Sequence, residues 1–291
     1  MKNNRFLRGL LPVLISGLTF GLMPGAVTAC YKLGATRETM VVGRYLVLVL
    51  ALLPFVLRKK DTFRIYKKHF WPLLAVSAAG AATPLMLYGA YKHMATGIVT
   101  TLHFLYPALV MLLELIFFRK RISGRRWLCL ALCAGGVILM MDPAGGLNGI
   151  GLALTAGCTA TWSLYIIGVD HLRPEGASSL QMMFYVSLNS FSILFVYGLI
   201  TGGLRPQLDA GGWLAVLGAC AAIAILGSLL FTVGIRNTDG QTAAIASTLE
   251  PITSMVFGVL ALGEPFHWRL AVGAVMILTA VVLVSLREKK T

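Results

Sequence analysis

Charged residues, and acidic ones above all, are scarce in this sequence. The 291 residues include only 11 Asp and Glu, and charged residues of every type make up 12% of the chain. A soluble domain carries roughly 25% charged residues. Hydrophobic residues reach 57% and the mean hydropathy is +0.81. A soluble fold cannot bury so much apolar surface, so the composition indicates a chain that is solvated by lipid.

Cysteine and histidine are also rare, with five of each. No C-x-x-C pair occurs, so neither a zinc ribbon nor a thioredoxin-like motif is supported. The sequence also lacks H-E-x-x-H, G-x-S-x-G and paired aspartates within its apolar runs. We therefore expect no bound metal, no cofactor and no enzymatic activity.

Long apolar runs separated by short connectors fill the rest of the chain. A membrane span needs about 20 apolar residues at a rise of 1.5 Å each. Runs of this length in lipid must be helices, because every backbone polar group has to be paired internally. The sequence predicts an all-α polytopic membrane protein with ten transmembrane helices. The expected spans are 7–31, 39–57, 70–91, 97–118, 125–141, 148–169, 178–200, 211–235, 241–262 and 268–286.

The first apolar run could be either a transmembrane helix or a signal peptide. Lys2, Arg5 and Arg8 precede it, and Val27 to Cys30 resembles a lipoprotein cleavage box. The run is long enough to cross a bilayer and further spans follow it. We expect an uncleaved first helix.

Positive charge is distributed unevenly among the connectors. The net charge is +14, and most Lys and Arg residues fall at the chain ends and in connectors after every second span, including 58–69 and 119–126. Cytoplasmic loops carry this excess. We therefore expect a multi-pass protein of the cell membrane with both termini in the cytoplasm. The same charges could also contact anionic lipid heads, and we expect no nucleic-acid partner.

The two halves of the chain show a weak internal repeat. When the fourth and ninth spans are superposed, Leu105 aligns with Leu249, Pro107 with Pro251, Met111 with Met255 and Arg125 with Arg269. A proline in mid-span removes a helix hydrogen bond and kinks the helix. An odd number of spans per half would insert the halves in opposite directions, as in many secondary transporters. We expect two inverted five-helix repeats, residues 1–143 and 144–291.

Three features carry a resemblance to a known family. They are the five-plus-five layout with short loops, the segments Ser247–Ile252 and Leu262–Pro265 around the ninth span, and Val42-Gly43-Arg44-Tyr45 at the start of the second span. In these features the chain resembles the drug/metabolite transporter superfamily, in its ten-helix EamA-type branch. The first half departs from this pattern, with Phe118-Arg119-Lys120-Arg121 where the family has Gly-Glu and Tyr106 where the second half has Glu250.

The resemblance implies transport without a bound cofactor or ATP hydrolysis. It also implies that spans 1–4 and 6–9 line a central cavity, whereas spans 5 and 10 pack at the periphery. The expected partners are a small-molecule substrate and the lipid bilayer, and we expect the monomer to be functional.

Ionisable residues within the spans are the first candidates for a binding site, because burying them in lipid is costly. Glu250 lies about 13 Å along the ninth span, where it could hold a substrate amine or carry a proton. Tyr106 is its positional counterpart in the first half, and His103 lies one turn away. The alternative for each is a structural side chain that is hydrogen-bonded to a neighbouring helix.

Four further polar residues lie inside spans. Arg44 could bind a substrate carboxylate or phosphate, reach the membrane interface, or pair with Glu38. Glu114 is expected to pair with the 119–121 cluster. Trp162 and Asn189 lie too deep to be interface anchors and are candidates for the cavity wall. Four prolines are expected to act as hinges or kinks: Pro24, Pro84, Pro107 and Pro251.

The leading functional hypothesis is a secondary transporter or exporter of a small polar or amphipathic metabolite. Glu250 and Arg44 offer opposite charges, which would suit a zwitterion such as an amino acid. The alternative is proton-coupled efflux of cationic drugs through Glu250 or Glu114. An intramembrane enzyme or a channel is less well supported, since the sequence lacks catalytic motifs and repeated charge rings.

Overall fold

The computed structural model describes residues 6–58, 67–94, 96–119, 122–140, 148–172, 178–204, 207–262 and 268–285. The expected boundary between the halves, at residues 143 and 144, lies outside this part of the chain. So do Lys120 and Arg121 of the basic cluster and the Gly263–Pro265 segment. The helices of the first half are η1 (Phe6–Leu10), α2 (Leu11–Lys32), α3 (Arg37–Leu57), α5 (Phe70–Ala90), α6 (Thr96–His103), α7 (Tyr106–Phe118) and α8 (Gly124–Met140). Those of the second half are α9 (Gly149–His171), α10 (Ser179–Ile200), α11 (Ala210–Ala221), η2 (Ala222–Leu229), α12 (Leu230–Asn237), α13 (Gly240–Ala246), α14 (Leu249–Leu262) and α15 (Trp268–Ser285).

Six helical segments within the described residues are long and apolar enough to cross a membrane. They are Arg8–Lys32, Arg37–Leu57, Phe70–Ala90, Gly149–His171, Ser179–Ile200 and Ala210–Asn237. Tyr106–Phe118 and Ala271–Leu283 are shorter apolar helices. The all-helical prediction is therefore confirmed, whereas the ten continuous spans are not. Two of the expected spans, 97–118 and 241–262, are each divided into two helices.

Both divided spans break immediately before a proline. α6 ends at His103 and α7 begins at Tyr106, while α13 ends at Ala246 and α14 begins at Leu249. Proline has no N–H, so Pro107 and Pro251 cannot bond the carbonyls four residues earlier, those of His103 and Ser247. Near both breaks the hydrogen bonds tighten to a spacing of three residues, as from Glu250 N to the Ser247 carbonyl at 3.0 Å. The expected kinks are thus complete interruptions, whereas Pro24 and Pro84 lie inside continuous helices.

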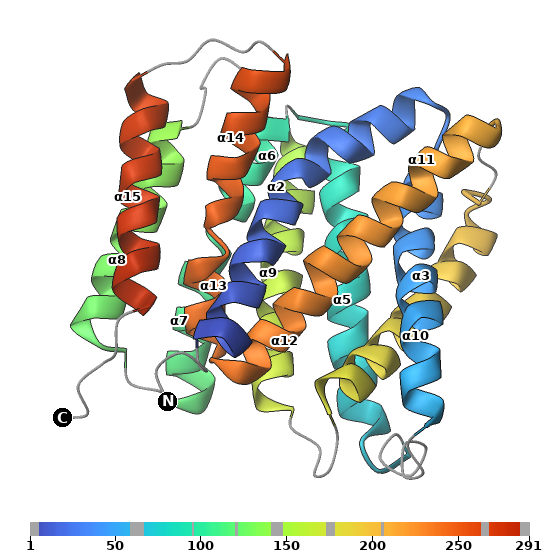
Figure 1. The fold of residues 1–291 in the computed structure, drawn as a ribbon, viewed down its shortest axis with the longest axis horizontal. Coiled ribbons are helices and arrows are strands. Elements are labelled where there is room, and N and C mark those ends of the chain that lie inside the picture. The colour runs from blue at the N-terminus through green and yellow to red at the C-terminus, as the bar shows by residue number, and fades with distance from the viewer. Residues whose placement is uncertain are drawn as a thin grey trace.

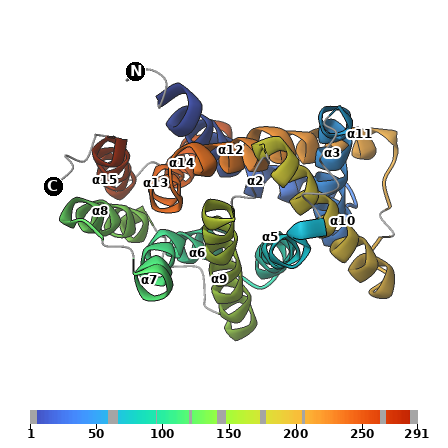
Figure 2. The same cartoon turned by 90° about the horizontal axis from the view of Figure 1, so that it is seen from below.

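Helices from opposite halves of the chain pack against each other throughout the bundle. α2 contacts α12 and α14, α9 contacts α5 and α7, and α10 contacts α3 and α5. α8 and α15 lie side by side at one edge in both ribbon views (Figures 1 and 2). These two helices are the expected spans 5 and 10, and their place agrees with the periphery that the resemblance implies.

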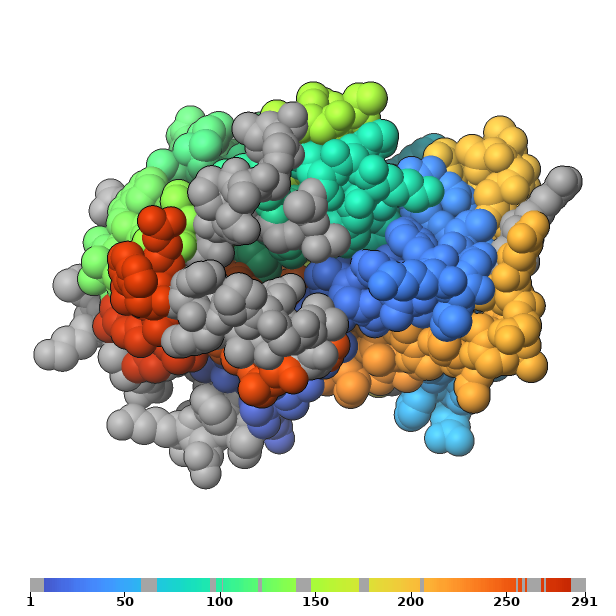
Figure 3. All heavy atoms as spheres, turned by 90° about the horizontal axis from the view of Figure 1, so that it is seen from above, coloured from blue at the N-terminus to red at the C-terminus, as the bar shows by residue number. Residues whose placement is uncertain are grey.

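The ends of the helices gather at two opposite faces of the bundle. Toward the bottom of Figure 1 lie η1, the ends of α3, α7 and α15, and the turn from α12 to α13. At the upper face, blue residues of α2 and α3 lie against gold and orange residues of the second half (Figure 3). Hydrogen bonds join the halves there, from Thr36 Oγ1 to the Gly203 carbonyl at 2.6 Å and from Arg37 Nη2 to the Tyr197 hydroxyl at 3.0 Å.

The contact between α2 and α14 requires a glycine. A Cβ at Gly21 would lie 2.5 Å from the Glu250 carbonyl oxygen and 2.5 Å from Thr253 Cβ. Real Cβ atoms do not approach so closely, so only glycine lets the two helices pack at this distance. The backbone of α14 at Glu250 is therefore held directly against α2.

We expect Gly21→Ala to destabilise the protein by about 1–3 kcal/mol, because the added methyl group must push α2 away from α14. The measurement is thermal unfolding of the purified protein in detergent. Gly218→Ala in α11 is the matched control, since no atom lies within 4 Å of a Cβ built there. Equal melting temperatures for the two variants would contradict the close approach.

Candidate functional site

One pocket collects most of the polar candidates. Its walls come from α2, α3, α5, α6 and α7 of the first half, and from α9, α12 and the α13–α14 break of the second half. The lining residues are Phe20, Met23, Arg44, Thr83, Pro84, Leu87, His103, Tyr106, Trp162, Phe231, Ser247 and Glu250. α10 contributes none of these residues, although the resemblance implied that span 7 would line the cavity.

Glu250 lies in the first turn of α14, directly after the break, and is 8% exposed. Its backbone N–H bonds the Ser247 carbonyl. Among the described residues, no hydrogen bond or ion pair engages its carboxyl oxygens. A buried carboxyl group normally has a protein partner. An open carboxyl in a pocket wall is instead a binding group for a proton or for a cationic part of a ligand.

Tyr106 joins the two helix breaks. It is the first residue of α7, and its hydroxyl forms a short hydrogen bond with the hydroxyl of Ser247 at the break between α13 and α14. The backbone carbonyl of Tyr106 accepts a hydrogen bond from Ser163 of α9 at 3.3 Å. The interruption in the first half is thus tied directly to the one in the second half, beside Glu250.

Aromatic rings form one side of the pocket around Trp162 of α9. The Trp162 ring stacks on Phe231 at 5.1 Å between centroids, and it meets Phe20 and Tyr106 edge-on at 6.1 and 6.4 Å. Rings in this arrangement give a rigid apolar wall whose faces also attract cations. The wall is built from α2, α7, α9 and α12, so both halves of the chain contribute to it.

Arg44 reaches the same pocket from α3 and is 6% exposed. It donates a hydrogen bond from Nη2 to Ser228 Oγ at 2.6 Å, and its guanidinium carbon lies 5.2 Å from the centroid of the Tyr45 ring. The suggested pairing with Glu38 is wrong, because Glu38 is bound by Arg37 at 2.6 Å. Within the described residues no carboxylate forms an ion pair with Arg44, so its positive charge is available to a ligand.

His103 ends α6 and is 5% exposed. Its Nδ1 atom lies 3.4 Å from Cys158 Sγ and 3.5 Å from Thr159 Oγ1, both on α9. Its ring lies 5.3 Å from that of Tyr106. The side chain both lines the pocket and packs against α9, so it combines the two roles that the sequence left open.

The structure brings five of the six predicted binding residues together: Glu250, Tyr106, His103, Arg44 and Trp162. Asn189 is different, because it is buried on α10 and is not among the lining residues. Of the four predicted hinge prolines, Pro84 also lines the pocket. Pro107 and Pro251 follow the two breaks, and Pro24 lies within α2.

Sequence reasoning missed the remaining lining residues. Ser247 stood in the segment that carried the family resemblance, and its position four residues before Pro251 was a usable signal. Phe20, Met23, Leu87 and Phe231 are apolar residues on apolar helices, and nothing in their sequence context distinguishes a pocket wall from a lipid-facing surface. Their roles follow only from how the helices pack.

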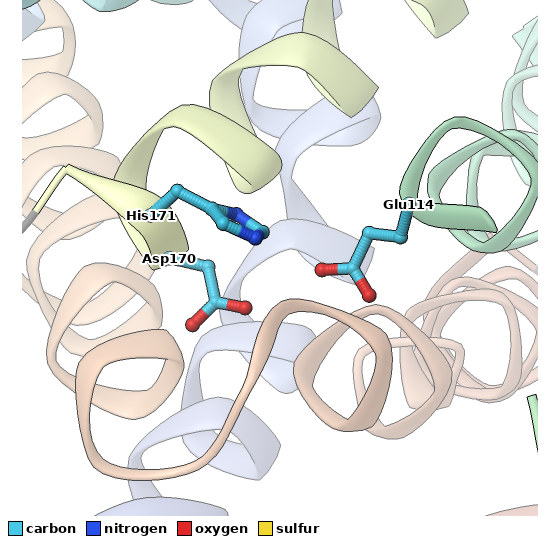
Figure 4. A group of neighbouring side chains, drawn as sticks. All are labelled: Glu114, Asp170 and His171. Atoms are coloured by element: carbon cyan, nitrogen blue, oxygen red, sulfur yellow. The ribbon is translucent and has the colours of Figure 1, made fainter. Parts of the chain in front are cut away.

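A second polar cluster lies at the end of the bundle where α7 and α9 finish. Figure 4 shows Glu114 of α7 extending toward Asp170 and His171 of α9. Ligand atoms of these three side chains lie within 4.8 Å of one another. Glu114 is fully buried and its Oε2 atom accepts a hydrogen bond from Gln241 Nε2 at 2.6 Å. The expected pairing of Glu114 with residues 119–121 involves Lys120 and Arg121, which lie outside the described residues.

Comparison with known proteins identifies the relatives of this chain. The model of the EamA-like transporter family matches residues 7–142 and again residues 149–286. The uncharacterized transporter YvbV of Bacillus subtilis (strain 168) is 26% identical over 84% of this chain and 79% of that protein. The uncharacterized transporter YwfM of the same organism is 25% identical over 77% of each chain. An uncharacterized transporter of Archaeoglobus fulgidus is 25% identical over 82% of this chain and 83% of that protein.

A solved structure has the same fold. A chain titled only as a crystal structure of protein superposes with a TM-score of 0.72 and covers 94% of both chains at 16% identity. At this identity the likeness concerns the fold alone. It supports the arrangement of helices around the pocket and adds nothing about the ligand.

The bond between the two helix breaks can be tested by a double-mutant cycle. We expect Tyr106→Phe and Ser247→Ala each to lower the free energy of unfolding by about 1 kcal/mol, and the double variant to lose much less than the sum. Thermal melts in detergent provide the measurement. Tyr106→Phe combined with Thr279→Ala is the control and should be additive, since Thr279 is exposed on α15 and bonds only its own helix. Additive losses for the Tyr106–Ser247 pair would show that the two breaks are independent.

Proposed function

The chain belongs to the EamA-like transporter family and is a multi-pass membrane transporter, and we propose that it carries a small zwitterionic metabolite, such as an amino acid, by alternating access. The observation that carries this proposal is the pair of buried charges in one pocket. Glu250 on α14 and Arg44 on α3 line the same pocket without an ion pair between them in the described residues.

A zwitterion supplies the missing partner for each charge. The Arg44 guanidinium can bind a carboxylate in a planar, two-point fashion, while the Glu250 carboxyl can accept hydrogen bonds from an ammonium group. The wall of Phe20, Trp162 and Phe231 would contact the apolar remainder of the ligand. No bound cofactor is needed for such a carrier.

We further propose that the chain consists of two inverted five-helix halves, residues 1–143 and 144–291, with ten spans in total. Three observations support this division. The family model matches each half separately, and the two broken spans are interrupted before the equivalent prolines Pro107 and Pro251. The helix contacts also correspond between the two halves: α2 packs on α14, and the equivalent helix of the second half, α9, packs on α7. Ser247 and Tyr106 join the halves at the pocket, where a carrier of this design binds its substrate.

We propose a cell-membrane location with both termini in the cytoplasm, and a functional monomer whose pocket is complete within one chain. The distribution of positive charge supports this orientation. In Figure 1, η1 and the end of α15 lie on the same side as the end of α7 and the start of α8, and Arg119 follows α7 while Arg125 and Arg126 lie in the first turn of α8.

Efflux of cationic drugs is the second candidate function. The open carboxyl of Glu250 and the aromatic wall favour a cation. The buried Arg44 in the same pocket disfavours it, because its positive charge would repel the ligand. An exporter of cations would also show a strong pH dependence, since the proton and the drug would compete for one carboxyl group.

A thermal-shift screen against amino acids and other small metabolites identifies the ligand. A ligand at 100 times its dissociation constant stabilises the protein by about 2.7 kcal/mol. We expect Glu250→Gln and Arg44→Gln each to weaken binding and transport of that ligand about ten- to hundredfold, because each removes a charge-assisted hydrogen bond. Flux is measured with the labelled ligand in reconstituted vesicles.

Glu38→Gln is the matched control for Glu250→Gln, because Glu38 is a buried glutamate outside the pocket. Unchanged flux in Glu250→Gln would refute the proposed role of this residue. Improved flux of cations in Arg44→Gln would instead support the drug-efflux alternative.

The orientation is tested with reporter fusions. We expect a reporter that is active only in the cytoplasm to be active at both ends of the chain, and one that needs the outer side to be inactive at both. Activity on opposite faces would mean an odd number of spans and would rule out two oppositely inserted five-helix halves.

A further inference from the structure

The turn between α12 and α13 lies at the centre of a set of polar contacts, most of which join the two halves of the chain. We call its three residues, Asp239, Gly240 and Gln241, the inner latch. Asp239 precedes α13, and Gly240 and Gln241 are its first two residues; all seven residues of this helix (Gly240–Ala246) are buried. The Asp239 side chain caps this helix by accepting a bond from Thr242 N at 2.9 Å.

Two first-half helices contact the inner latch. The amide of Gln241 donates to Glu114 of α7 at 2.6 Å. Arg126 of α8 donates to Asp239 at 3.2 Å and forms a short hydrogen bond to the Gln241 side-chain oxygen. Both polar atoms of the Gln241 side chain are thus engaged: its nitrogen donates to the Glu114 carboxylate, and its oxygen accepts from the Arg126 guanidinium.

The third contact comes from α9. The N–H of Gly240 donates to Asp170 Oδ2 at 3.0 Å, and a Cβ at this glycine would lie 3.5 Å from an oxygen of both Asp170 and Glu114. The latch supplies hydrogen-bond donors to two carboxylates that lie close together on the neighbouring helices α7 and α9, as Figure 4 shows for Glu114 and Asp170.

The latch lies next to the pocket along the chain. The seven residues of α13 are about 10 Å long, and Ser247, which lines the pocket, follows the last of them directly. Polar groups buried in a lipid-facing bundle are costly to separate unless water can enter. Breaking the latch therefore requires the bundle to open to water at this end, and forming it expels that water.

We propose that the inner latch is the closure of the substrate pocket at the end of the bundle that holds the connections from α7 to α8 and from α12 to α13, and that its bonds to Glu114, Arg126 and Asp170 break when the pocket opens to that side. This proposal rests on the proposed transport function. The statement that this side is the cytoplasm rests on the proposed orientation of the chain in the membrane. It adds Gln241 and Arg126 as residues that control access without lining the pocket.

The experiment measures access to the pocket rather than transport. The five native cysteines are replaced by alanine, and Thr83→Cys introduces a thiol in the pocket wall. A charged, membrane-impermeant maleimide is added to right-side-out vesicles and, separately, to inside-out vesicles. Two latch variants are compared in this background. Gln241→Leu removes the amide that bonds Glu114 and Arg126, and Arg126→Gln removes the bonds to Asp239.

We expect both latch variants to label about five- to tenfold faster than the parent from the cytoplasmic side, since each lost hydrogen bond shifts the closed–open equilibrium by about that factor. Labelling from the outer side should slow. Asn237→Ala is the matched control, because Asn237 is exposed beside the latch and bonds only its own helix. It should label at the parent rate from both sides.

Parent labelling rates from both sides in the two latch variants would overturn the proposal, provided that their thermal melts show folded protein. Arg126 is partly exposed, so Arg126→Gln remains a test if the buried change at Gln241 prevents folding. The labelling needs no substrate. The latch can therefore be shown to control access even if no ligand of the carrier is found. If a ligand is confirmed but the latch variants do not change access, the latch is rejected and the transport proposal stands.

Discussion

The main constraint on this molecule is that a helix in lipid has no water to satisfy a backbone group that loses its partner. Pro107 and Pro251 each remove one such partner in the middle of the bundle. The two helix breaks lie where the two halves meet, and polar side chains gather around them. Tyr106, Ser247, Ser163 and Glu250 all lie within a few residues of a break or bond directly to one. The pocket is therefore located where the helices cannot be continuous.

The same constraint explains why polar side chains are few and concentrated. Apart from the pocket and the inner latch, five buried Ser and Thr residues bond the carbonyl four residues earlier in their own helix: Ser77, Thr155, Thr159, Ser163 and Thr232. Such a bond uses the hydroxyl proton within the residue's own helix, so the hydroxyl has no donor left for a ligand. Glu250 and Arg44 depart from this rule, because neither is satisfied by a carboxylate or guanidinium partner among the described residues.

Much of this organisation could be predicted from the sequence because it depends on hydropathy and on proline. Helix positions followed from the apolar runs, and the high cost of certain residue types in lipid was enough to identify five of the lining residues. The prediction was wrong in treating 97–118 and 241–262 as continuous kinked helices, since a proline can also end one helix and begin another.

Other parts of the site could not be predicted, because they depend on how the helices face one another. Asn189 is a polar residue in the middle of an expected span, but it lies on α10, which contributes nothing to the pocket wall. The depth of a residue along a span does not determine whether its side of the helix faces the pocket. The inner latch was missed because Gln241 and Gly240 are ordinary residues near the start of an apolar run, and their partners are more than 60 residues away in the chain.

The close approach at Gly21 has a further consequence for how such a bundle could move. At Gly21, α2 packs so closely on the backbone and the Thr253 Cβ of α14 that no side chain fits between them, so sliding the two helices past each other would make these atoms collide. If the protein works by the alternating access proposed for it, its moving units are then not the two sequence halves themselves. Each unit has to contain helices from both, with α2 travelling together with the segment that carries Glu250. If the chain were made as two fragments, one for each repeat, each fragment would hold a complete five-helix sequence. α2 and α14 would nevertheless lie on different fragments, although they need to move together.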